Sequence, residues 1–165
     1  MINTYVLEMS GSDISVITDE LWRLICTERG GILATTNADG SPQLSNIYYV
    51  SSPEGREIRF STTTVRRKGR NLLRDPRAAL HVSGANFLNF AVATGDVTLG
   101  VPCTPDDPAI DELFEIHEAL GARPLRAVFG EQMVAANRMA VRLTVTRLYG
   151  QLIDREPREI GRQNG

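Results

Sequence analysis

The stretch FSTTTVRRKGRNLLRDPR, residues 60–77, joins a predicted strand to a predicted basic helix. Ile58 and Phe60 alternate with polar neighbours, which is typical of a half-buried strand, and three threonines follow. After the threonines there is a single acid, Asp75, among the cations Arg66, Arg67, Lys68, Arg70 and Arg74. The first N–H groups of a helix point outward and its dipole favours negative charge. A strand that ends in hydroxyls before such a helix is therefore suited to hold an anion.

The alternative interpretation of this charge run is a solvated helix face, which is the usual fate of such runs. Three features favour the anion site. The cations lie at the start of the helix, where the dipole disfavours positive charge unless an anion is present. The hydroxyls of residues 61–64 lie directly before the cations and can donate hydrogen bonds to a phosphate. Arg66 and Arg70 are four residues apart and share one helix face, and Arg67 and Asn71 share another in the same way. RNA is the competing anionic partner, but no pattern of aromatic residues for base stacking accompanies the cations.

The residues before this stretch predict an antiparallel meander. Strands are expected over residues 31–36 and 43–50, and Asp39-Gly40 between them is a strong hairpin signal. A second turn then leads into the strand at residues 57–62. Hairpin connections of this kind produce an antiparallel sheet.

Asn46 is the unusual residue of the strand at 43–50. Alternation places it on one face with Leu44, Tyr48 and Val50, which are largely apolar. A polar amide on such a face needs a hydrogen-bond partner. The partner is either a ring system with carbonyl and N–H groups or another part of the protein, and the sequence leaves both open.

The rest of the chain predicts further strands with helices inserted between them. The elements expected are a short strand or lead-in at Ile14 to Ile17, a helix from Thr18 or Asp19 to Arg29, the basic helix at 65–73, strands at 78–83, 89–99 and 139–145, a helix from Asp106 or Asp107 to Leu120, and a helix within 124–137. Gly95 predicts a bulge or barrel bend in its strand. Residues 147–153 either extend the last strand or bend away. Six antiparallel strands with inserted helices indicate a mainly β fold, a small barrel.

Length and charge restrict the class of protein. The chain has 165 residues, a net charge of −2 and a pI near 5.7. We expect one domain over residues 1–165, with its core at about 20–153 and a polar tail at 154–165. Proteins that bind nucleic acids or anionic membranes usually carry a net positive charge, so we expect this chain to bind neither. A small anionic ligand fits its net charge better. No apolar run is long enough to span a membrane.

Other candidate sites are weak. Cys26 and Cys103 are not spaced like the cysteines of metal-binding or redox motifs. A disulfide between them is one interpretation, but a reduced cytoplasmic chain is the simpler one. His81 and His117 have no partner at metal spacing, and a satisfied structural histidine is the better interpretation of each. Phosphate loops of the Walker and Rossmann types are absent. If the chain is an enzyme, a cofactor carries its chemistry.

The motifs also carry a family resemblance. The runs GILATTNADGSPQLSNIYYV, IRFSTTTVRRKGRNLLRDPRAALHV and FAVATGDVTL resemble the split β-barrel flavoproteins related to pyridoxamine 5′-phosphate oxidase. Within these, the chain looks most like the B branch of the actinobacterial flavin/deazaflavin oxidoreductases, whose members bind coenzyme F-420. The resemblance covers roughly residues 20–153. Its specific parts are PQLSN, the R-x-K-x-R-N-L-x-R-D-P-R run and the terminal Tyr149-Gly150.

The resemblance implies a set of cofactor-binding residues. It places the phosphate on Arg66 and Lys68, with Asn71 nearby and Arg67 at the arginine position of oxidase-like relatives. The ribityl chain and phosphate would meet the strand end at Ser61, Thr62 and Thr63. The ring system would lie beside Asn46 and Tyr48 and the loop that contains Val82, Ser83, Ala85 and Asn86. In this family the cofactor lies at a homodimer interface.

The chain departs from the FMN-dependent relatives in two places. Their second strand has further basic residues where this chain has Asn46 and Ser51, which favours the deazaflavin over FMN. In the loop beside the ring, where the relatives often have an aromatic residue, this chain has Leu88, with Phe87 and Phe90 close by.

The resemblance therefore implies a homodimeric, cytoplasmic oxidoreductase that transfers hydride from reduced coenzyme F-420 to an electron-poor enone or unsaturated lactone. The alternatives are an FMN-dependent pyridoxine-phosphate-oxidase-like enzyme or flavin reductase, a non-catalytic carrier of F-420 or flavin, and a haem-handling relative.

Overall fold

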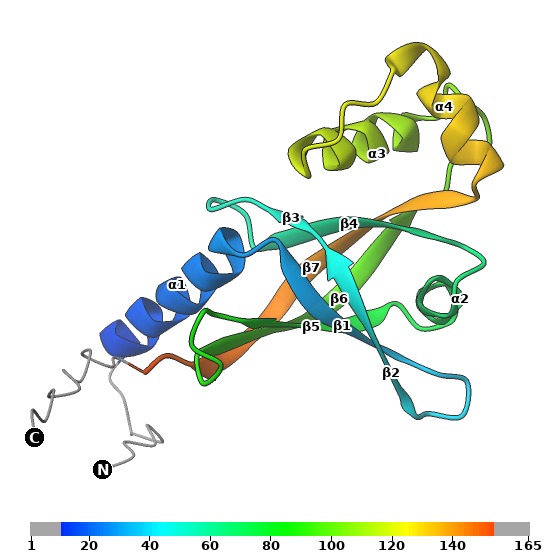
Figure 1. Cartoon of the computed structure of the whole chain (residues 1–165). Coiled ribbons are helices and arrows are strands. Elements are labelled where there is room, and N and C mark those ends of the chain that lie inside the picture. The colour runs from blue at the N-terminus through cyan, green and yellow to red at the C-terminus, as the bar shows by residue number, and fades with distance from the viewer. Residues whose placement is uncertain (1–10, 154–165) are drawn as a thin grey trace, which may run out of the picture.

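The computed structural model describes residues 11–153, with side chains from residue 18 onward, and the tail expected at 154–165 lies outside them. Seven strands form one antiparallel sheet, and four helices surround it (Figure 1). The elements in chain order are α1 (Gly11–Thr27), β1 (Gly30–Thr36), β2 (Pro42–Tyr48), β3 (Val50–Ser51), β4 (Glu57–Thr63), α2 (Arg67–Arg74), β5 (Arg77–Ser83), β6 (Phe90–Gly100), α3 (Pro108–Ala119), α4 (Arg126–Ala135) and β7 (Arg138–Gln151).

β2 and β3 are consecutive in the chain but lie at opposite edges of the sheet, whose order is β2-β1-β5-β6-β7-β4-β3. The continuous strand expected over 43–50 is therefore wrong at its end, because β2 stops at Tyr48 whereas Val50 pairs with β4. Tyr49 lies at the crossing, and its backbone N–H still donates to the carbonyl of Arg29 at 3.0 Å. Because one short segment reaches both edges, the sheet curls into an open half-barrel (Figure 1). The mainly β, split-barrel fold is confirmed, with seven strands instead of six.

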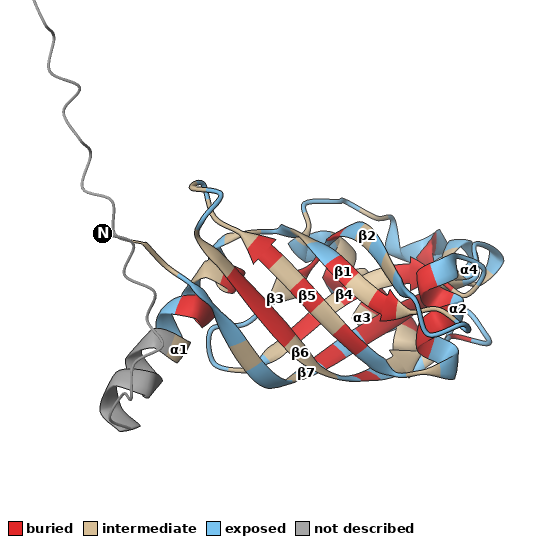
Figure 2. Ribbon diagram, turned by 90° about the horizontal axis from the view of Figure 1, so that it is seen from below, coloured by how far each residue is buried: buried red, intermediate tan, exposed pale blue. Residues whose placement is uncertain are grey.

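The core fills the concave side of this sheet. Buried and exposed residues alternate along the strands (Figure 2), as a sheet with one covered face requires. The largest fully buried strand side chains are Leu33, Ile58, Phe60, Leu80, Met139 and Leu143. α1 closes one end of the core with Leu21, Trp22 and Ile25. The Tyr49 hydroxyl donates to the carbonyl of Ile25 at 2.8 Å, and burial raises the pKa of this phenol.

α3 and α4 pack against each other and against β7 at the other side of the sheet (Figure 1). Their small core consists of Ile110, Leu113, Ile116, Phe129 and Ala140. Asp107 caps α3 by accepting from the N–H of Ala109 at 2.9 Å, as the sequence predicted. Gly121 follows the helix with a φ of +89°, a conformation that glycine adopts without strain.

The structure also decides the expectations for the first helix, the Gly95 bulge, the last strand and the cysteines. The short strand or lead-in at Ile14 to Ile17 and the helix start at Thr18 or Asp19 are wrong, because α1 already begins at Gly11. Spacings of three and four between Ile14, Ile17, Leu21 and Leu24 are helical and carried the missed signal. The bulge at Gly95 is confirmed by a register shift between β6 and β7, and β7 extends to Gln151. Cys26 and Cys103 are free thiols, and no helix of the described residues is long and apolar enough to cross a membrane.

The bulge generates a stability prediction for Gly95→Ala. A Cβ at position 95 would lie 1.9 Å from the carbonyl oxygen of Thr144, so the backbone of β7 must shift. We expect a loss of about 1–3 kcal/mol in the free energy of unfolding, measured by urea denaturation. Gly55→Ala is the matched control, since the nearest atom to its Cβ is 3.9 Å away. Equal stability of the two variants would contradict the assigned register.

Candidate functional site at the seam of the half-barrel

α2 bridges the opening between the two halves of the curled sheet, which we call the seam: the free edge of β2 on one side and the end of β4 on the other. A Cβ at Gly69 would lie 2.0 Å from the carbonyl oxygen of Thr63, so only glycine lets the first turn of α2 lie on β4. From the same turn, the Lys68 ammonium donates to Ser45 Oγ at 3.3 Å and to the carbonyl of Asn46 at 3.4 Å, both on β2. α2 thus ties β4 to β2 across the seam.

Lys68 is a buried cation without a carboxylate partner in the part of the chain that the structure describes. Its residue is 9% exposed, and its contacts are a hydroxyl and a carbonyl at long distances. Burial, and next the positive charge of Arg66, lower the pKa of Lys68 from its ordinary value. A buried charge that lacks an opposite charge is costly, so an anion at this position would stabilise it.

The other cations of the basic run divide into two groups. The guanidinium groups of Arg70 and Arg74 donate to the carbonyls of Val65 and Thr36, and Arg77 forms a two-bond ion pair with Asp75. Hydrogen bonding from Arg77 lowers the pKa of Asp75 to about 2. The three cations closest to the start of α2, Arg66, Arg67 and Lys68, form no ion pair with a described residue.

Two buried hydroxyls at the end of β4 also lack a partner. Thr62 is 0% exposed and Thr63 is 8% exposed, and neither Oγ1 has a hydrogen bond among the described residues. Alternation places Thr62 on the core face, whereas Ser61 and Thr63 lie on the opposite face, so the three do not point to one side. Arg138 at the start of β7 donates to Ser61 Oγ at 3.4 Å and adds a fourth cation to the seam.

The start of α2 has the electrostatics of an anion site. Its N-cap residue Arg66 makes no side-chain capping bond, and its first turn contains no acidic residue. Its N–H groups, the Lys68 ammonium and the unpartnered hydroxyl of Thr63 are all donors. This donor set fits the phosphate group of a nucleotide-like cofactor.

Asn71, by contrast, is used within the protein. Its Nδ2 donates to Thr35 Oγ1 at 3.0 Å and to Asn37 Oδ1 at 3.2 Å, and its Oδ1 accepts from Arg74. These contacts hold α2 against the β1–β2 hairpin. A contact between Asn71 and a cofactor stays a prediction.

The free edge of β2 offers backbone hydrogen-bonding groups. In the β1–β2 hairpin, the pairs Arg29–Tyr49 and Asn37–Ser41 are hydrogen-bonded. Hydrogen-bonded and non-hydrogen-bonded pairs alternate along antiparallel strands. The N–H and C=O groups of Leu44, Asn46 and Tyr48 therefore point away from β1, and the Asn46 carbonyl already accepts from Lys68 there. A flat ligand with its own N–H and carbonyl groups can pair with this edge.

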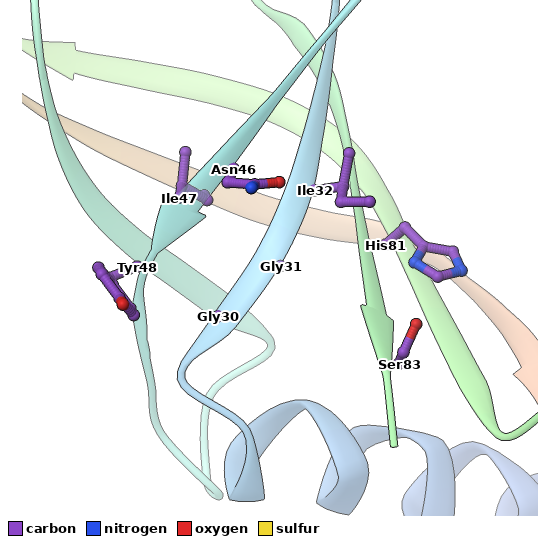
Figure 3. Close-up of a pocket in the computed structure, with 8 residues that line it drawn as sticks. All are labelled: Gly30, Gly31, Ile32, Asn46, Ile47, Tyr48, His81 and Ser83. Carbon is purple, nitrogen blue, oxygen red and sulfur yellow. The ribbon is translucent and has the colours of Figure 1, made fainter. Parts of the chain in front are cut away.

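A pocket of about 440 Å³ lies next to this edge, on the convex outer face of β2, β1 and β5 (Figure 3). Its lining residues are Gly30, Gly31, Ile32, Asn46, Ile47, Tyr48, His81 and Ser83. Asn46 joins the pocket to the seam, because its side chain lines the pocket while its carbonyl meets Lys68. The His81 ring stacks on Phe90 with centroids 5.5 Å apart.

The sequence matches the pyridoxamine 5′-phosphate oxidase family over residues 17–152, which is most of the chain. The chain belongs to the pyridoxamine 5′-phosphate oxidase family. Solved structures with the same fold include an F-420 reductase, with 24% identity, a TM-score of 0.56 and coverage of 74% of this chain and 90% of that one. A conserved hypothetical protein from Mycobacterium tuberculosis is 23% identical, with a TM-score of 0.57 and coverage of 85% and 82%. An FMN-binding, pyridoxamine 5′-phosphate oxidase-related protein from Nostoc punctiforme is 17% identical, with a TM-score of 0.55 and coverage of 86% and 83%.

In this member of the pyridoxamine 5′-phosphate oxidase family, the residues expected from sequence fall into three groups. At the seam lie Ser61, Thr62, Thr63, Arg66, Arg67, Lys68 and Asn71. At the pocket lie Asn46, Tyr48 and Ser83. The third group lies outside both: Val82 is fully buried in the core, Ala85 is an exposed loop residue, and Asn86 Oδ1 accepts from the N–H of Leu88 at 3.2 Å.

Sequence reasoning missed Ser45, Arg138 and His81. The alternation of β2 predicts that Ser45 and Asn46 point to opposite faces of the sheet. No local pattern in the sequence, however, shows that Lys68 reaches Ser45. Arg138 is far from the basic run in sequence and meets it only through the pairing of β4 with β7. The expectation for His81 of a satisfied structural histidine does not hold for hydrogen bonding, since its ring nitrogens have no partner among the described residues. His117 matches that expectation, because its Nδ1 lies 2.7 Å from the carbonyl of Leu113.

The buried charge generates a prediction for the ligand-free protein. In Lys68→Met, an apolar chain of similar length replaces a poorly partnered ammonium, so the free energy of unfolding should be unchanged or rise by up to about 1 kcal/mol. The control Leu72→Ala removes a core side chain that is 1% exposed and should cost about 2–5 kcal/mol. Urea denaturation of both variants measures this. A large loss of stability in Lys68→Met would show that Lys68 serves the fold instead of a ligand.

Proposed function

We propose that this chain is an oxidoreductase that uses coenzyme F-420 and binds the phosphate of the cofactor at the seam. The observation that carries the proposal is the buried ammonium of Lys68, which has no ion pair among the described residues, together with the unpartnered buried hydroxyl of Thr63. Buried donors without acceptors are rare in folded proteins and mark sites where a ligand completes the hydrogen bonding. A phosphate supplies both the acceptor oxygens and the negative charge.

The charge of β2 supports F-420 over FMN. None of its residues, PQLSNIY, carries a charge, and Lys68 is the cation that reaches this strand. The terminal phosphate of FMN carries up to two negative charges, whereas the phosphodiester of F-420 carries one. Because β2 adds no base of its own to the seam, the site suits the singly charged group better. The PQLSN motif and the similarity in fold to an F-420 reductase point the same way.

The free edge of β2 is our proposed partner for the ring system. A deazaflavin has a pyrimidine edge with alternating carbonyl and N–H groups, and the backbone groups of Asn46 and Tyr48 can pair with it. When bound and reduced, the cofactor supplies a hydride from C5. The residues of this chain hold the phosphate, orient the ring edge and leave the neighbouring pocket for the acceptor, an electron-poor enone or unsaturated lactone.

We further propose that the protein is a homodimer and that the second copy covers the outer face of β2. Leu44 is 63% exposed, Tyr48 is 74% exposed and Ile32 is 41% exposed, and all three lie on this one face. Large apolar side chains gathered on one face are characteristic of an interface. A second copy would turn the open pocket into an enclosed one, consistent with a cofactor site at the subunit interface.

The dimer is tested by Leu44→Glu. A carboxylate in the centre of the proposed interface should shift the mass in solution from dimer to monomer, measured by light scattering after size exclusion. Leu125→Glu is the matched control, because Leu125 is 69% exposed next to α4, away from this face. A monomeric wild-type protein, or a Leu44→Glu variant that stays dimeric, would contradict the proposed interface.

The cofactor is tested by titrating the purified protein with F-420 and with FMN. We expect F-420 to bind more tightly, and Lys68→Met to weaken its binding by about 1–3 kcal/mol through loss of a charge-assisted contact. Arg123→Met, which removes an exposed cation between α3 and α4, should leave the affinity unchanged.

The other outcomes of this titration are distinct. Tighter binding of FMN would indicate an FMN-dependent pyridoxine-phosphate-oxidase-like enzyme or a flavin reductase. Binding of F-420 without turnover of any enone or quinone would indicate a carrier. An unchanged affinity in Lys68→Met would place the phosphate elsewhere.

A further inference from the structure

The two histidines of the chain lie in different environments. His117 is engaged within the protein, since its Nδ1 lies 2.7 Å from the carbonyl of Leu113 and its ring packs edge-on against Phe129. His81 stacks on Phe90 and lines the outer-face pocket (Figure 3), and no described residue forms a hydrogen bond with its ring nitrogens. The His81 ring is therefore free to donate to a molecule in the pocket.

The pocket suits a flat molecule with a polar end. Its floor is β1, where Gly30 and Gly31 have no side chains and Ile32 is apolar. A Cβ added at Gly30 would have as its nearest neighbour the Tyr48 ring at 3.9 Å, so this part of the floor is open. His81 and Ser83 from β5 bring polar groups to one side of the pocket, and β2 forms the other side.

His81 is the only histidine that lines this pocket, and imidazole is the side chain that enzymes use most often as a general acid or base. The remaining titratable group that lines the pocket is the Tyr48 phenol of β2. From β6, the neighbours of His81 are the uncharged Phe90 and Val92; from β7, Tyr149 pairs with Val92 on the far side of β6. No carboxylate and no lysine lines the pocket.

His81 and the cofactor edge are in register across three strands. Ile32 of β1 pairs with Asn46 on one side and with His81 on the other. Adjacent strands are about 4.8 Å apart, so the backbones of β2 and β5 are about 10 Å apart. A molecule that lies across Ile32 can therefore reach Asn46 with one end and the His81 ring with the other.

We propose that this pocket takes the hydride acceptor, a planar conjugated carbonyl compound, and that His81 is the catalytic residue that protonates it. This inference rests on the proposed function. The acceptor gains a hydride at its β-carbon from the reduced deazaflavin, which loses two electrons, and the π electrons of its C=C bond move towards the carbonyl oxygen. The imidazolium N–H bond of His81 breaks, its proton goes to that oxygen, and the neutral ring takes a new proton from water. The resulting enol rearranges to the saturated carbonyl product.

The first test reads ligand binding without the cofactor. Protein with ¹⁵N-labelled imidazole rings gives NMR signals from two histidines, which His81→Gln assigns. We expect 4-nitrophenolate, a stable mimic of the enolate oxygen, to shift the His81 signals to saturation and to leave those of His117 unmoved. Gly30→Leu fills the pocket floor and should abolish the shift. Unmoved His81 signals, or equal shifts in wild type and Gly30→Leu, would overturn the proposal.

The second test separates this inference from the proposed function. His81→Gln should lower kcat with an enone by about 10²–10⁴-fold and leave the Kd for F-420 within twofold. Added imidazole should restore part of the rate in His81→Gly, which a purely structural role would not allow. His117→Gln should retain the wild-type kcat. Normal F-420 binding with unchanged kcat in His81→Gln would overturn this inference alone, whereas absent F-420 binding by the wild type would overturn the proposed function.

Discussion

The close approach of α2 to the end of β4 is the constraint on which the rest of the site depends. A Cβ at position 69 would lie 2.0 Å from the carbonyl oxygen of Thr63, so the helix can take this place only because glycine follows Lys68. With the helix fixed there, Lys68 points to β2, Asn71 points to the β1–β2 hairpin, and the two halves of the sheet are joined by polar contacts instead of a continuous strand ladder. The half-barrel thus keeps a seam lined by donors, which a closed barrel would not have.

This seam lowers the stability of the ligand-free protein. A buried ammonium without a carboxylate and two buried hydroxyls without acceptors each cost free energy, and apolar residues of the same shape would avoid that cost. This cost in stability is confined to the seam, because the described part of the chain has no other buried side-chain oxygen or nitrogen without a hydrogen-bond partner. Buried polar groups without partners that are confined to one place in a fold are expected at functional sites. A cofactor at this place is our proposal, and membership of the pyridoxamine 5′-phosphate oxidase family agrees with a cofactor of the flavin type.

Local signals in the sequence were sufficient for most elements and for the basic run. Asp39-Gly40 predicted a hairpin, Asp107 predicted the start of a helix, and Gly95 predicted a bulge. These three features were predictable because each of them depends on the backbone chemistry of one or two residues. The crossing at Tyr49 was not predictable, since alternation continues through residues 43–51 while the pairing partner changes from β1 to β4. For the same reason the sequence could not place Arg138 at the seam or His81 beside Asn46. These neighbours arise from pairing between strands that are distant in the chain, and no local pattern encodes them.

We propose that Lys68 and Thr63 meet the same phosphate of F-420, and a double-mutant cycle on F-420 affinity tests this most directly. Thr63→Val removes only the unpartnered hydroxyl and keeps the shape of the side chain. If both groups bind one phosphate, the loss of affinity in the double variant Lys68→Met with Thr63→Val should differ from the sum of the single losses by about 0.5–3 kcal/mol. Strictly additive losses, or no loss in either single variant, would contradict a phosphate bound at the seam.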